Sequence, residues 1–116
     1  MSGKRGSRMS VSREFESYVV DQLAAAGVVK TRRMFGGVGL YIDGVFCAII
    51  GADSGRLFLK VDASNQADYE REEMEPFRTR RGTMSYYEVP VHVLEDRDLL
   101  REWALKARAV GLKGAK

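Results

Sequence analysis

The hydrophobic pattern along the chain changes from helical spacing to strict alternation near residue 28. Apolar side chains recur at helical spacing from residue 15 to residue 26, behind serines at positions 10 and 12, either of which can cap the first turn. Gly27 follows as a residue that can end the helix. Beyond it the apolar residues recur with a period of two, which predicts strands. The first third of the chain is therefore expected to be one helix followed by the start of a sheet.

Six extended segments are predicted from this alternation and from the turn signals between them. They cover residues 28–35, 38–42, 45–50, 56–61, 77–80 and 84–89. The Gly36-Gly37 pair bends the chain after the first segment, and Asp43-Gly44, the strongest short hairpin signal, joins the second to the third. Segment 45–50 is apolar on both sides, which predicts a central strand covered on both faces.

Two further helices and a short helical turn complete the expected elements. A short helix runs from a cap at Asp62 or Ser64 to about residue 72, and a terminal helix runs from a cap at Asp96 to Gly111. A helical turn follows Pro90. The predicted fold class is α+β: a five-stranded antiparallel sheet with flanking helices, in the order α-β-β-β-α-β-β-α. This order counts three strands before the short helix, although four of the extended segments precede it.

Length and composition point to one domain with two short tails. The chain has 116 residues, of which 45% are hydrophobic and 30% charged. We expect residues 1–9 to be a flexible basic tail, residues 10–112 a single domain and residues 113–116 a second tail. No apolar run is long enough for a membrane helix and no signal peptide is recognisable, so no membrane association is expected. Cys47 is the only cysteine, which excludes an internal disulfide and fits a cytoplasmic location.

The net charge of +3 comes from the ends of the chain. Five of the 19 basic residues lie in the terminal segments, namely Lys4, Arg5, Arg8, Lys113 and Lys116, and the remaining 14 are outnumbered by 16 acidic residues. The body of the chain therefore lacks the basic excess that is typical of a nucleic-acid-binding domain. This weakens a nucleic-acid function without excluding it.

Two arginine-rich segments are the candidate contacts for a partner or for nucleic acid. Arg32 and Arg33 precede the glycine bend, and Arg78, Arg80 and Arg81 lie on or beside a predicted hairpin tip. If these segments meet, they form a positive face for phosphates or for an acidic protein surface. The alternative is that the arginines pair with the nearby glutamates as a solvated network.

Catalytic and ligand-binding patterns are weak. The glycines of residues 36–39 match neither dinucleotide-binding nor P-loop spacing, and the acidic residues are too dispersed for a metal site, so no metal, no cofactor and no catalytic residue is expected. A small-ligand or catalytic site would have to combine the glycine bend with Tyr41, Ser85 or His92. We expect the protein not to be an enzyme.

A series of motifs in order along the chain resembles the N-terminal domain of the TfoX/Sxy family. The resemblance spans about residues 15–110. It is carried by residues 33–41, 43–48, 57–62, 76–77 and 84–90 with Asn65, and by a motif set that we expect to be mainly structural: Met34, Phe35, Gly36, Gly37, Gly39, Tyr41, Lys60, Ser85, Tyr86, Tyr87, Pro90 and Trp103.

The resemblance implies a fold more firmly than a function. Members are similar to secretion-chaperone-like α+β folds with a five-stranded antiparallel sheet. Full-length TfoX/Sxy proteins regulate natural competence as transcriptional coactivators working with the cyclic-AMP receptor protein. They carry a second, helical domain, which we do not expect in a chain of this length. No catalytic residues are known for the family. The leading interpretation is a non-enzymatic regulatory module that binds another protein, with a homodimer as one form of partner. Direct nucleic-acid binding, or contact with it through a transcription factor, is the second interpretation, and catalysis or small-ligand binding the third.

Overall fold

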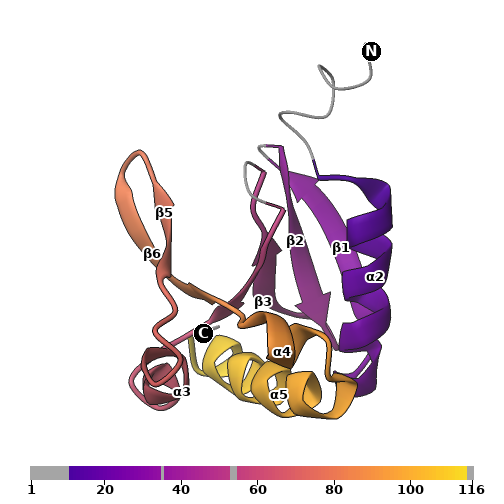
Figure 1. Cartoon of the computed structure of the whole chain (residues 1–116). Coiled ribbons are helices and arrows are strands. Elements are labelled where there is room, and N and C mark those ends of the chain that lie inside the picture. Colours follow the sequence, from indigo (N-terminus) through magenta and orange to yellow (C-terminus); the bar gives the residue numbers. More distant parts are fainter. Residues whose placement is uncertain (1–10, 35, 53–54, 115–116) are drawn as a thin grey trace.

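One antiparallel sheet of six strands organises the molecule, in the order β1-β2-β3-β4-β6-β5 (Figure 1). The computed structural model describes residues 11–34, 36–52 and 55–114. The strands are β1 (Val29–Met34), β2 (Gly37–Ile42), β3 (Val45–Ile50), β4 (Leu57–Lys60), β5 (Pro76–Thr79) and β6 (Gly82–Glu88). The α+β class is confirmed, but the expected five strands are wrong. The segments on either side of the glycine bend are separate strands, because Met34 pairs directly with Gly37 across a tight turn.

Most of the helices begin where the sequence predicts. The short helix is an exception, because Asn65 rather than Asp62 or Ser64 is its N-cap and no side chain caps it. The helices are α2 (Arg13–Leu23), which continues into the short 3₁₀ helix η1 (Ala24–Ala26), then α3 (Gln66–Glu70), α4 (Val91–Leu94) and α5 (Arg97–Gly114). Ser12 caps α2 by accepting a hydrogen bond from the Phe15 backbone N–H at 3.1 Å. Asp96 caps α5 in the same way through the Leu99 N–H. Among the described residues, none of these helices has the length and apolar character needed to cross a bilayer.

The core lies between one face of the sheet and the helices. Alternate residues of β2, namely Val38, Leu40 and Ile42, are fully buried on this side. In β3 the pairing register shifts beside Leu40 so that Cys47 has no partner, and both Cys47 and Ala48 are buried there. The long helix α5 packs directly on β3, where Gly111 lies against Val45.

The position of β3 corrects one expectation. It is central in the sheet, as predicted, but the described helices pack on only one of its faces, the face of Val45 and Cys47. Phe46 and Ile49 belong to the other face, where they are only partly buried. The apolar run of β3 predicts cover on both sides because the bulge at Cys47 removes the alternation that would distinguish the two faces.

The hairpin of β5 and β6 extends beyond the rest of the sheet (Figure 1). Only residues 86–88 of β6 pair with β4. Residues 78–85 are all exposed, and we call them the arm. Two surfaces of the molecule are therefore not used by the core. They are the second face of the sheet and the arm.

Candidate interaction face of the sheet

The second face of the sheet gathers residues from five strands. Strand alternation and the pairing registers place on it Lys30, Arg32, Met34, Gly39, Tyr41, Phe46, Ile49, Phe58, Lys60, Tyr86 and Glu88, which we call the open face. The helix contacts lie on the opposite side. There α2 holds Arg33 through Glu16, α3 contributes Tyr69 beside Tyr87, and α5 packs on β3. In the part of the chain that the structure describes, no helix packs on the open face.

Aromatic rings run across the open face. The ring centres of Tyr41 and Phe46 are 5.2 Å apart, and those of Phe46 and Tyr86 are 6.0 Å apart. These separations are those of favourable aromatic pairs. Gly39 makes room for the row, because a Cβ on it would lie 2.8 Å from atoms of both Met34 and Phe46.

The rings differ in how much solvent they meet. Tyr86 is 3% exposed and Phe58, which stacks with Phe77 at 4.8 Å, is 6% exposed. Burial raises the pKa of Tyr86 to about 12. Tyr41, Phe46 and Ile49 remain partly exposed. The surface is thus an apolar platform in which the side chains of Tyr41, Phe46 and Ile49 are accessible to a partner.

Positive charge surrounds this platform. The Lys60 ammonium lies 4.9 Å from the centre of the Tyr86 ring, a cation–π geometry. Lys30 and Arg32 are exposed on β1, beside Tyr41 and Gly39. None of these three cations forms an ion pair with any residue that the structure describes. Glu88, the one carboxylate of the open face, is engaged by Arg56 at 3.2 Å.

The structure separates the predicted arginines rather than bringing them together. Arg32 and Arg33 lie on β1 at one edge of the sheet, whereas the arm lies at the other edge. Arg33 points to the helix side, where it binds Glu16 at 2.6 Å and the Val11 carbonyl oxygen at 3.2 Å. Four strand intervals separate β1 from β6, roughly 19 Å. Arg32 therefore belongs to the open face and Arg33 to the packing of α2.

The arm carries the other three arginines. Arg78 pairs with Glu75 at 3.0 Å, in line with the expected solvated network. Arg80 and Arg81 occupy the turn between β5 and β6, and neither has an ion pair within the described ranges.

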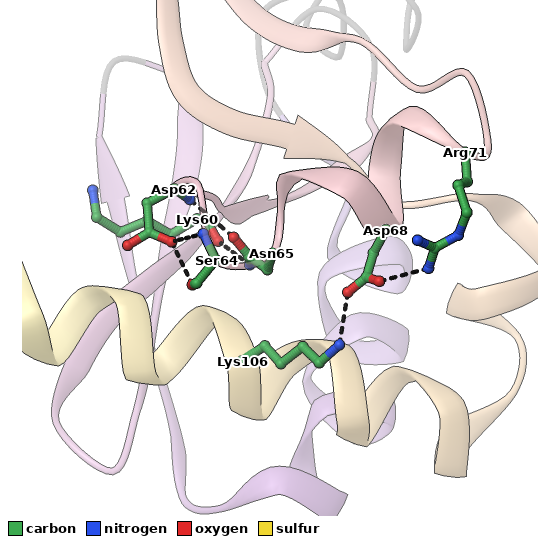
Figure 2. Close-up of polar contacts among 7 residues, drawn as sticks. All are labelled: Lys60, Asp62, Ser64, Asn65, Asp68, Arg71 and Lys106. Carbon is green, nitrogen blue, oxygen red and sulfur yellow. Dashed lines mark hydrogen bonds and ion pairs between the residues drawn. The ribbon is translucent and has the colours of Figure 1, made fainter.

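A polar network that the sequence analysis missed joins β4 to α3 (Figure 2). Asn65 is 2% exposed. Its side chain accepts a hydrogen bond from the Asp62 N–H at 2.9 Å and donates one to the Lys60 carbonyl oxygen at 3.2 Å. Asp62 in turn accepts from the hydroxyl and the N–H of Ser64. The signal in the sequence is the run of Asp62, Ser64 and Asn65, because Asp, Ser and Asn favour turns in which their side chains hydrogen-bond to the nearby backbone.

Ion pairs fasten α5 to the same segment. Lys106 and Arg71 both bind Asp68, at 2.8 and 2.7 Å, as Figure 2 shows. These bonds lower the pKa of the Asp68 carboxyl, with Lys106 as the largest cause. The Lys113 ammonium lies 2.9 Å from the Asp62 carboxylate. The pKa of Asp62 is lowered to about 2, and the hydrogen bond from the Ser64 side chain is the largest cause, followed by that from Lys113. These charges hold elements together, so their perturbed pKa values reflect packing.

The residues considered for catalysis do not meet. Ser85 lines a shallow hollow of about 330 Å³ with Lys60, Asp62 and Lys113. Tyr41 lies on β2, three strand positions from β6, and His92 lies on α4, where it contacts Glu72 at 3.1 Å. Cys47 is fully buried, which raises the pKa of its thiol to about 11. Within the described residues, no three His, Cys, Asp or Glu side chains are grouped as metal ligands.

The remaining motif residues mostly support the fold. Gly36 has a positive φ of 82° in the turn, and a Cβ on Gly37 would lie 2.6 Å from the Ile50 carbonyl oxygen. Trp103 packs edge-on against Tyr69 at 4.7 Å, and Pro90 precedes α4. Phe35, residues 1–9 and residues 115–116 lie outside the described residues.

The comparisons with known proteins agree with the motif pattern. The sequence matches the family described as TfoX N-terminal domain over residues 21–110. This range takes in all six strands and most of α5. No curated protein matches the chain. Because the match covers most of the sequence, the chain belongs to the TfoX N-terminal domain family.

Proposed function

We propose that the domain is a non-enzymatic regulatory module that binds a partner protein through the open face. The observation that carries this proposal is the row of rings from Tyr41 through Phe46 to Tyr86, on a sheet face against which no described helix packs. Such a face combines an apolar centre with a polar rim, the arrangement of protein interfaces. The family resemblance supports a regulatory role, because full-length TfoX/Sxy proteins act in competence.

The charge of the open face indicates what kind of partner fits. Lys30, Arg32 and Lys60 lack carboxylate partners among the described residues, and the only acidic side chain on the face is already paired. An acidic segment with aromatic or aliphatic side chains would neutralise the cations and cover Phe46 and Ile49. A second copy of the domain fits less well. A two-fold axis brings the same patch of both copies together, so uncompensated cations would face one another.

A peptide-display selection against the full chain tests the proposal. We expect the selected peptides to be rich in Asp and Glu with interspersed aromatic or aliphatic residues. Reversing the rim charges with Lys30→Glu and Arg32→Glu should weaken a selected peptide by about tenfold or more, measured by calorimetry. The matched control is Arg80→Glu with Arg81→Glu, which changes charge equally at the far edge of the sheet and should alter the affinity by less than about twofold.

Two results would contradict the proposal. One is a selected peptide set without acidic enrichment, or peptides whose affinity survives the rim reversal. The other is a homodimer in sedimentation experiments that Ile49→Asp dissociates, because the open face would then be an interface between copies. Ile49 is partly exposed, so this substitution does not place a carboxylate in the core.

A further inference from the structure

The arm ends in positive charge that neither the fold nor the open face uses. All of its residues are exposed, and Figure 1 shows the hairpin extending away from the helices. Arg80 and Arg81 lie at its turn, without an ion pair in the described part of the chain. Two unneutralised guanidinium groups therefore sit at the outermost point of a two-stranded ribbon.

Side-chain hydrogen bonds fix the shape of this tip. The Thr79 hydroxyl accepts a hydrogen bond from the Arg81 N–H at 3.2 Å and donates one to the Gly82 carbonyl oxygen at 3.0 Å. Gly82 has a φ of +126°, a conformation that other residues rarely adopt. The turn that carries Arg80 and Arg81 is thus shaped by local contacts and does not need a partner to form them.

The composition of the arm favours nucleic acid over protein. Protein interfaces depend on a few buried aromatic or aliphatic anchors. Met84, which is 39% exposed, is the only large hydrophobic side chain between residues 78 and 85. Guanidinium groups bind phosphates through paired hydrogen bonds, and the major groove of B-DNA, about 12 Å wide, admits a two-stranded ribbon.

We propose that the arm binds duplex nucleic acid, with Arg80 and Arg81 contacting backbone phosphates on either side of a groove. This inference goes beyond the proposed protein-binding function and does not depend on it. Lys30 and Arg32 of the open face lie on β1, across the sheet from the arm. Lys60 pairs with Tyr86, and the turn that carries Arg80 and Arg81 lies at least five residues along the chain from Tyr86, so the two surfaces can be occupied separately. A module of this kind would hold a partner protein beside nucleic acid.

Fluorescence anisotropy with a labelled duplex of about two helical turns tests the inference. The full chain carries Lys4→Gln, Arg5→Gln and Arg8→Gln in every sample, so that the basic side chains of residues 1–9 do not contribute. Into this background we place either Arg80→Gln with Arg81→Gln, or the matched pair Lys30→Gln with Arg32→Gln. All four positions are exposed, and equal thermal unfolding midpoints verify that the variants fold.

We expect the arm pair to weaken binding by about tenfold and the matched pair by less than about twofold. The slope of log affinity against log salt should fall by about 1.8 when two phosphate contacts are lost. An absence of binding in the starting background, or an equal loss in both pairs, would overturn the inference. So would equally tight binding of poly-glutamate that depends on the same arginines, because the arm would then be a general polyanion site.

Discussion

Gly111 of α5 lies so close to Val45 of β3 that a Cβ on the glycine would come within 2.7 Å of Val45 Cγ1. The Phe46 carbonyl oxygen lies 3.1 Å from the same point. The sequence predicts that Gly111 ends the helix, but α5 continues to Gly114. Gly111 therefore allows the close approach of helix and sheet. It sets the distance between α5 and β3, the strand that carries Phe46 on the open face.

Replacing Gly111 with alanine should destabilise the fold. Alanine improves helix propensity by about 1 kcal/mol. However, forcing a methyl group against a strand costs about 1–3 kcal/mol, so we expect a net loss of up to about 2 kcal/mol in the free energy of unfolding. Urea denaturation followed by circular dichroism measures it. Gly114→Ala is the control, because that position has nothing within 4 Å, and it should not lower the stability.

Loss of the Asn65 side chain should also lower the stability. Asn65→Ala leaves the Asp62 N–H and the Lys60 carbonyl oxygen without their partner, which should reduce the free energy of unfolding by about 1–3 kcal/mol. Ser17→Ala removes an exposed hydroxyl on α2, away from this network, and should change the stability by no more than about 0.5 kcal/mol. Equal effects of the two substitutions in denaturant titrations would mean that the buried amide does not organise the turn.

Much of the fold is predictable because local signals agree with the tertiary structure. The Asp43-Gly44 turn predicts its hairpin, since both residues have positive φ, 49° and 84°, as a type I′ turn requires. Ser12 and Asp96 predict the starts of their helices for a similarly local reason. Tyr86 and Tyr87 lie on opposite faces of β6, as alternation predicts.

The candidate site is less predictable because it depends on contacts between distant segments. Arg32 and Arg33 look equivalent in the sequence, yet β-strand alternation sends one to the open face and the other to Glu16. The packing of α2 and α5 determines which face of the sheet stays uncovered. The strand order, which puts the arm far from β1, is also set by pairings between distant segments.

The Cys47 thiol should be unreactive in the folded protein. It is 0% exposed, and burial raises its pKa to about 11, so both access and thiolate formation are suppressed near pH 8. We expect a thiol reagent to modify it quickly in urea and slowly without urea. In a Cys47→Ala background, Ala109→Cys supplies an exposed thiol on α5 that should react quickly in both conditions. Fast modification of native Cys47 would show that the core opens readily.

Asp62 should make the stability depend on acid pH. Its pKa is lowered from 3.8 to about 2 in the folded state, so its contribution is present above the unfolded pKa and is lost as pH falls through about 2. The free energy of unfolding should therefore decrease below about pH 4, and Asp62→Asn should flatten this decrease. Carboxyl-carbon NMR measures the pKa directly. Ser64→Ala should raise it more than Lys113→Met does, because the Ser64 hydrogen bond is the largest cause. The reverse order would place the main interaction with α5.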